Sequence, residues 1–199
     1  MRRTTPRFYI SIATAVLSVL LLAAGGLLLW GSAYIHNTVQ GQLAAQQITF
    51  PSKAAFAHPK AGTEITSSMI PSVSQYAGEQ LLTGQQAEAY ADHFIAVHIA
   101  DMGGGKTYSQ LSTESLAQPS NTQLAGLVNT VFKGETLRSM LLSAYGWWKV
   151  SQITYIASLT AFGFGTFAAI GAAFGLATSR KPQTRVTIAH ESIIPVETA

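Results

Sequence analysis

The run of residues that most resembles a nucleotide-binding motif lies at positions 100–107 and reads A-D-M-G-G-G-K-T. It fits a relaxed P-loop pattern in which alanine replaces the first glycine. A P-loop joins a strand to a helix, so that backbone N–H groups and the helix N-terminus surround a phosphate. Here the run follows a predicted helix, and the chain shows no alternation of strands and helices. We therefore expect these glycines to end a helix, and we expect no nucleotide binding.

Three side chains of the preceding helix, His93, His98 and Asp101, are candidate metal ligands. On a regular helix a five-residue spacing places the two imidazoles about 140° apart, which is too far for one ion. His98 and Asp101 are close enough but supply only two ligands, and nothing in the sequence brings His58 or Glu88 to them. A polar helix face with a half-buried histidine is the simpler interpretation, so we expect no metal site.

Other catalytic arrangements are also missing from the sequence. It has no nucleophile elbow, no evident Ser–His–Asp arrangement and no acidic pair in glycosidase-like surroundings. Cysteine is absent, which excludes disulfides and cysteine-linked lipid anchors. We therefore predict that the chain is not an enzyme and that it needs no cofactor.

Two long stretches, residues 8–52 and 150–179, contain no Asp, Glu, Lys or Arg. Their most apolar parts, residues 8–35 and 150–178, are long enough to cross a bilayer, because about 20 apolar residues span a hydrocarbon core of roughly 30 Å. The first is also about twice as long as the apolar part of a signal peptide, so we expect an uncleaved anchor.

The charges outside these predicted spans indicate the orientation. Basic residues near the ends of a span are retained on the cytoplasmic side. The segment between the spans carries six basic and seven acidic residues, a net charge of −1. We therefore expect both termini in the cytoplasm. Because the basic excess is confined to the two ends, it does not indicate a nucleic-acid partner. The basic residues of the ends are Arg2, Arg3, Arg7, Arg180, Lys181 and Arg185.

Aromatic residues support this orientation, because amphipathic rings prefer the level of the lipid headgroups. Phe8 and Tyr9 mark the inner boundary. The outer boundary is marked by Trp30, Tyr34, Tyr145, Trp147, Trp148 and Tyr155.

The predicted fold class is a mainly α membrane protein, in which two transmembrane helices flank a small, mostly helical extracytoplasmic domain. The predicted order is a cytoplasmic N-terminus at 1–7, a span at 8–35, an outer domain at 36–149, a span at 150–178 and a cytoplasmic tail at 179–199.

Within the outer domain, apolar periodicity and turn residues predict several elements. Thr83 can cap a helix that ends at the glycines 103–105. The others are a helical extension at 38–47, an extended piece at 48–51, loops at 58–75 and 112–120, a helix at about 121–132, and a helix from 135 that continues into the second span.

The second predicted span carries small residues at four-residue steps. Such a row lets another backbone approach closely, which is how helices associate in lipid. We predict a helix-packing interface, formed with the first span, with a separate membrane protein, or with both. Its residues are Ala157, Ala161, Gly165, Ala169, Ala173 and Ala177, with Gly171 and Gly175 as an additional G-x-x-x-G pair.

The C-terminal tail alternates over residues 184–196, reading T-R-V-T-I-A-H-E-S-I-I-P-V. Such a segment can add as a strand to the edge of a partner's sheet, although tails of this size are commonly disordered.

About half of the chain resembles a family of uncharacterised actinobacterial two-span membrane proteins. In that family the outer segment carries a G-K-T-Y-x-E-L turn, and an L-R-x-x-L-L-N-A-Y-x-x-W stretch leads into the second span. This chain has Gln110 and Ser143 where the family has Glu and Asn. The matching positions are His98, Gly105, Lys106, Thr107, Tyr108, Arg138, Tyr145 and Trp148.

Members of this family are often labelled aromatic ring-opening dioxygenases, and we do not extend that label to this chain. The chemistry needs two histidines and a carboxylate facing one iron, and the helix geometry above does not supply them. The resemblance therefore supports the architecture and leaves the activity open.

Two functions from different classes follow from these features. The first is a non-catalytic accessory subunit of a larger membrane complex, such as a respiratory supercomplex or an envelope lipid-transport assembly, with the bilayer and an integral membrane protein as partners. The alternative is a membrane-anchored outer module that binds or senses a lipid or a cell-wall fragment.

Overall fold

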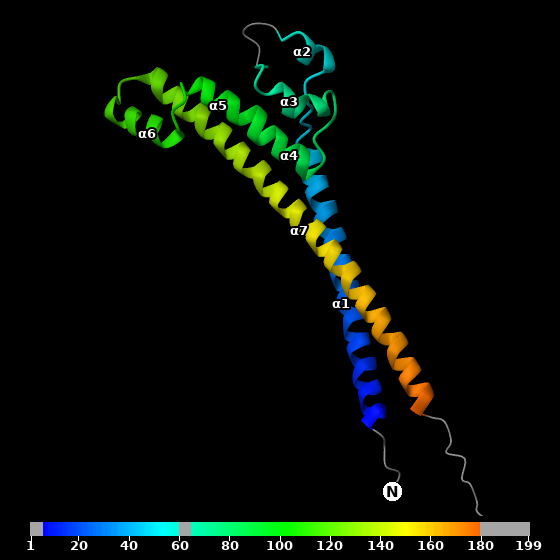
Figure 1. Ribbon diagram of the computed structural model, residues 1–199. Helices are drawn as coiled ribbons and strands as arrows, with labels where there is room; N and C mark the ends of the chain where they lie inside the picture. Colours follow the sequence, from blue (N-terminus) through cyan, green and yellow to red (C-terminus); the bar gives the residue numbers. More distant parts are fainter. Residues whose placement is uncertain (1–5, 60–64, 180–199) are drawn as a thin grey trace, which may run out of the picture. The chain divides into compact units, whose positions relative to one another are not determined.

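The computed structural model describes residues 6–59 and 65–179, and this part of the chain is mostly helical (Figure 1). Two long helices account for most of it. The elements are α1 (Pro6–Ala45), α2 (Lys53–Ala57), α3 (Ile70–Val73), the 3₁₀ turn η1 (Ser74–Tyr76), α4 (Gly84–Tyr90), the π-helical η2 (Ala91–Ile95), α5 (Ala96–Met102), α6 (Tyr108–Ala117) and α7 (Thr122–Ser179).

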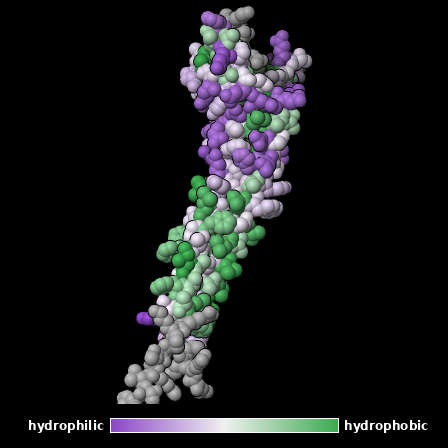
Figure 2. Space-filling view, turned by 90° about the vertical axis from the view of Figure 1, so that its right-hand side faces the viewer, coloured by the Kyte–Doolittle hydropathy of each residue, from purple (hydrophilic) through white to green (hydrophobic). Residues whose placement is uncertain are grey.

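Both long helices are long and apolar enough to cross a membrane. In each of them only 11% of the most apolar window is buried, whereas the core helix of a soluble protein is mostly buried. Large side chains such as Leu27 and Phe167 are more than two-thirds exposed. Figure 2 shows hydrophobic side chains gathered along part of the paired helices. A surface this apolar is typical of a membrane-facing helix pair.

The described residues form two compact units. The first contains residues 6–23 of α1 and 162–179 of α7, and the second contains residues 24–59 and 65–161. The two long helices therefore contribute to both units, and their contacts are described separately for each.

In the first unit, α1 and α7 approach closely because the facing residues are small. The Ser18 hydroxyl donates a 2.8 Å hydrogen bond to the backbone carbonyl of Gly165. A Cβ atom placed on Gly165 would lie 3.0 Å from the Leu22 side chain, and one placed on Gly175 would overlap the Ser11 hydroxyl. Glycine at these two positions leaves room for a serine of α1, and at Gly165 the serine reaches the backbone of α7.

The second unit repeats this arrangement. The Ser32 hydroxyl donates a 2.7 Å hydrogen bond to the carbonyl of Ser151, and both serines are buried. Further along the two helices the contact becomes apolar, with Val39 of α1 and Trp148 of α7 buried in the main core.

One set of buried positions on the two long helices, here called the seam, recurs every seven residues along each helix. A step of seven residues rotates by only about 20° around a helix, so that such positions stay on one face. The seam consists of Ser11, Ser18, Gly25, Ser32 and Val39 on α1, and of Ser151, Ser158, Gly165 and Ala172 on α7.

The predicted row of small residues on α7 does not follow this seam. A step of four residues rotates by about 40°, so the row winds around the helix and crosses the seam at Gly165. Gly165 is buried, and Ala161, Ala169 and Gly175 are partly buried. Ala157, Gly171, Ala173 and Ala177 are exposed. Within the described residues, α1 therefore covers the row only around its central residue, Gly165, and a contact of the exposed members with another protein stays a prediction.

The longest predicted helix of the outer segment is present, and it contains an irregularity. Thr83 caps it as predicted: its hydroxyl accepts from the Gln86 N–H, and the Gln86 side chain accepts from the Thr83 N–H. The helix then passes through α4, η2 and α5 and ends at Gly103. Because η2 is π-helical, the regular spacing assumed for His93 and His98 does not hold there.

This helix packs along α7 within the second unit. Gly84 lies against Trp148, and Gly134 lies against Ile99, so the two helices run in opposite directions. The core around them contains fully buried Leu81, Ala87 and Val131.

Several local predictions were wrong. Residues 112–120 are not all loop, because α6 extends from Tyr108 to Ala117. The region 58–75 contains α3 and the start of η1. The two helices predicted at 121–132 and from 135 onward are a single helix, α7, which passes through Gly134 without a break. The short helix α2 was not predicted.

The extended piece predicted at 48–51 is present as an isolated antiparallel bridge between Thr49 and Gln80, and the described residues contain no longer strand. Hydrogen bonds from Phe50 N to Glu79 O and from Leu81 N to Ile48 O, both 2.9 Å, hold it. The bridge joins the chain after α1 to the start of α4.

Candidate functional site

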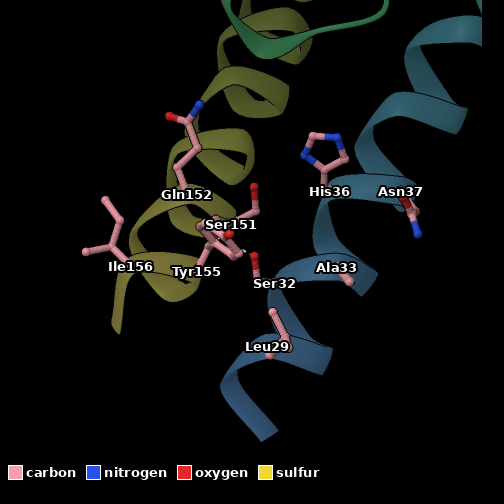
Figure 3. Close-up of a pocket in the computed structure, with 9 residues that line it drawn as sticks. All are labelled: Leu29, Ser32, Ala33, His36, Asn37, Ser151, Gln152, Tyr155 and Ile156. Atoms are coloured by element: carbon pink, nitrogen blue, oxygen red, sulfur yellow. Dashed lines mark hydrogen bonds between the residues drawn. The ribbon is translucent and has the colours of Figure 1, made fainter. Parts of the chain in front are cut away.

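A groove lies between α1 and α7 in the second unit, with a volume of about 620 Å³. This volume is within the usual range for ligand sites, about 300–1,000 Å³. Figure 3 shows side chains from both helices around it. The groove is lined by Leu29, Ser32, Ala33, His36, Asn37, Ser151, Gln152, Tyr155 and Ile156.

Seam serines lie at the base of this groove. The Ser32 hydroxyl donates to the Ser151 carbonyl, and the Ser151 hydroxyl donates to the Trp148 carbonyl, each at 2.7 Å. Both hydroxyl protons are therefore already used within the protein. The Ser32 hydrogen bond joins α1 to α7 at this level, so the groove does not depend on a ligand to form.

The lining of the groove changes from polar side chains at one end to apolar side chains at the other. The His36 ring on α1 and the Gln152 side chain on α7 lie toward one end of the groove, whereas Leu29 and Ile156 lie toward the other (Figure 3). The end nearer the predicted outer domain is thus polar, and the end nearer the predicted spans is apolar (Figure 3).

The polar end of the groove carries no formal charge, since no Asp, Glu, Lys or Arg lines it. The side chains of His36, Asn37, Gln152 and Tyr155 form no hydrogen bond with any residue in the described part of the chain. Their donors and acceptors are available to a ligand.

Trp148 supports the polar end from inside the protein. Its ring lies 4.1 Å from the His36 ring, centroid to centroid, and it also lies against Gly84, where a Cβ atom would overlap it. Trp148 is 6% exposed, and its indole N–H has no hydrogen-bond partner among the described residues. The tryptophan therefore fixes His36 through packing.

The residues of the predicted G-K-T-Y turn have local structural roles. Gly104 and Gly105 adopt positive φ angles of 59° and 76°, which favour glycine. Thr107 caps α6 and forms a capping box with Gln110. Glutamine performs this function as well as glutamate does, so the departure from the family pattern at this position keeps the cap.

The side chains on either side of this cap also have partners. Lys106 forms an ion pair with Glu114 on α6, and the Tyr108 ring lies 5.5 Å from the ring of Phe132 on α7. The glycine-rich run thus ends α5 and starts α6. A P-loop must follow a strand, whereas this run follows the helix α5.

Arg138 connects α7 to η2. Its guanidinium donates a 2.8 Å hydrogen bond to Asp92, and Glu135 lies 3.6 Å away. The hydrogen bond to Asp92 raises the pKa of Arg138 above its usual value, so the guanidinium stays charged throughout the physiological range. The ion pair lies where the helix is π-helical, and it holds that irregular segment against α7.

His98 and Tyr145 are also engaged. The Nδ1 atom of His98 lies 2.7 Å from the Phe94 carbonyl, so Nδ1 carries the proton, while Nε2 is buried without a partner among the described residues. Lys149 lies 5.4 Å from the Tyr145 ring. In residues 6–59 and 65–179, no three His, Asp or Glu side chains lie close enough together to hold a metal ion.

Sequence reasoning did not single out the groove residues. The available signal was a set of polar side chains, including His36, Asn37 and Gln152, just beyond the apolar stretches. Which of them share a face became evident only from the pairing of α1 with α7. The predicted tail segment at 184–196 lies outside the described residues.

The fold and the groove define a class: a mainly helical protein with two helices long enough and apolar enough to cross a membrane. The chain matches none of the protein-family models, curated proteins or solved structures with which it was compared.

Proposed function

We propose that the chain is a two-pass membrane protein with both termini in the cytoplasm and with residues 36–149 outside. The two apolar helices and the basic residues at the two ends support this orientation. The resemblance to the actinobacterial two-span family is part of the same proposal.

Within that topology, we propose a non-catalytic accessory subunit of a larger membrane complex. The observation that carries this function is the set of small residues on α7 that α1 leaves uncovered, among them Ala157, Gly171 and Ala173. Small residues let a partner helix pack closely in lipid. A respiratory supercomplex and an envelope lipid-transport assembly are candidate hosts.

Substitution of Gly171 separates contact with a partner from internal packing. A Cβ atom placed on Gly171 meets nothing within 4 Å, so Gly171→Leu leaves the seam intact. We expect this change to reduce the amount of membrane-protein partner recovered with the chain in mild detergent. Gly163 is the matched control, because it is equally open and lies about 80° away around the helix. Equal recovery with Gly171→Leu and Gly163→Leu contradicts the proposal for this face.

The groove favours a second candidate function, a free-standing module that binds a ligand at the membrane surface. Its unengaged polar groups and its preformed base are the observations in favour. Purification in mild detergent distinguishes the two functions. A stoichiometric membrane-protein partner indicates the accessory subunit, and a lone monomer or dimer indicates the module.

A further inference from the structure

We propose that the groove between α1 and α7 binds a diacyl lipid whose headgroup is uncharged and bears hydroxyl groups. This inference goes beyond the accessory-subunit function and does not depend on it. It rests on the change of polarity along the groove, on the absence of charge in its lining, and on its preformed base.

The apolar end of the groove fits an acyl chain. Leu29 and Ile156 line it, and they are 40% and 63% exposed. Both lie deeper inside the segments predicted to cross the bilayer than Gln152 does, so in the proposed topology hydrocarbon surrounds this end of the groove. An acyl chain that lies between the two side chains stays within the apolar layer and covers apolar surface on both helices.

The polar end of the groove fits an uncharged headgroup. His36, Asn37 and Gln152 together offer both donors and acceptors, which suits hydroxyl groups because a hydroxyl donates one hydrogen bond and accepts others. A phosphate needs a compensating cation and is usually held by Arg or Lys. None lines the groove, and the nearby Lys149 lies over the Tyr145 ring.

The rigid base of the groove favours discrimination between lipids. The Ser32 hydrogen bond and the packing of His36 on Trp148 fix the groove before a ligand arrives. A preformed site loses less conformational entropy on binding than a flexible one. The groove should therefore distinguish headgroups.

The test measures lipid binding to the purified full-length chain in detergent, by native mass spectrometry and by the shift in thermal unfolding. The probes are monoglucosyl diacylglycerol, phosphatidylglycerol and phosphatidylethanolamine with identical acyl chains. We expect the glucosyl lipid to bind tightest. Replacement of Gln152 by Leu should weaken its binding roughly tenfold, as expected for the loss of one or two hydrogen bonds, and should leave phosphatidylglycerol binding unchanged. Equal or tighter binding of phosphatidylglycerol by the unmodified chain overturns the proposal.

Filling the groove provides an independent variant. Ala33 lines the groove, so Ala33→Phe should abolish the lipid-induced shift in thermal unfolding. The matched control is Ala24→Phe, which changes an exposed alanine of α1 outside the groove. The unfolding of both variants without lipid shows whether the fold is retained. If Ala33→Phe binds the glucosyl lipid normally, or displaces a membrane-protein partner without changing lipid binding, the groove is not a lipid site. The accessory-subunit proposal is tested separately, through Gly171.

Discussion

Single glycines determine how closely helices approach in this protein. Gly165 is buried where the Ser18 hydroxyl reaches its carbonyl, and Gly84 lies against Trp148 where any side chain would overlap the indole. At other glycines of α7, such as Gly126 and Gly163, an added Cβ atom would meet nothing within 4 Å. The value of a glycine here is the space that it leaves for a neighbour.

Gly165→Leu should therefore destabilise the pairing of α1 with α7 in the first unit. The added side chain meets Leu21 and Leu22 within 3.3 Å of its first carbon, and overpacking of this kind typically costs about 1–3 kcal/mol. Reversible unfolding in detergent measures the loss. Gly163→Leu on the same helix is the control, and unchanged stability in Gly165→Leu would contradict the assignment of Gly165 to the seam.

Lys106→Ala should have little effect on the fold. Lys106 pairs with Glu114 at partly exposed positions, and exposed ion pairs typically contribute about 0.2–1 kcal/mol. Because the glycine-rich run ends one helix and starts another, nucleotide affinity should not depend on this lysine. An ATP titration of the wild type and of the variant, followed by calorimetry, checks this. ATP binding that disappears with the lysine would revive the P-loop interpretation.

At the scale of elements, the helix α6 depends on its N-cap residue, Thr107. Thr107 and Gln110 satisfy each other's backbone N–H groups, and the helix that follows buries only Leu111. Thr107→Ala should destabilise it by about 0.5–2 kcal/mol, because so little packing compensates. Amide hydrogen exchange over residues 108–117 should accelerate, whereas exchange in α4 should not. Thr107→Ser, which keeps the hydroxyl, is the control.

The same element shows what the sequence could and could not predict. The long helices, the cap at Thr83 and the stop at Gly103 follow from local patterns, and the structure has all three. Residues 112–117 of α6 were predicted as loop, because serine and threonine residues mask a capping box when no apolar periodicity follows. The π-helical turn at Ala91–Ile95 depends on packing and on the Asp92–Arg138 contact, which no local pattern encodes.

The groove and the seam were harder to predict for a different reason. Ser32 and Ser151 are 119 residues apart, so their contact follows only from the register of two antiparallel helices. The row of small residues on α7 was recognised, but only Gly165 of that row is buried against α1. The seven-residue spacing of Ser151, Ser158 and Gly165 was present in the sequence and was the better guide.

At the scale of the whole molecule, the charge distribution predicts the topology. A reporter that is active only in the cytoplasm, fused after Ala199, should be active, and the same reporter inserted after Gln118 should be inactive. The physical reason is the retention of basic residues on the cytoplasmic side. The reverse pattern would place both termini outside and would invalidate the orientation.

The hydroxyl groups of the seam also bear on biogenesis. Those of Ser11, Ser151 and Ser158 donate to carbonyls three or four residues earlier in their own helix, whereas Ser18 and Ser32 donate across to α7. A serine without its partner can donate to a carbonyl of its own helix. Each long helix can therefore satisfy the hydrogen bonds of its seam serines in hydrocarbon without the other helix. In the proposed two-pass topology, insertion should therefore not require pairing, and pairing should follow in the bilayer. Damage to the seam should leave a chain that is inserted in the correct orientation and yet unpaired.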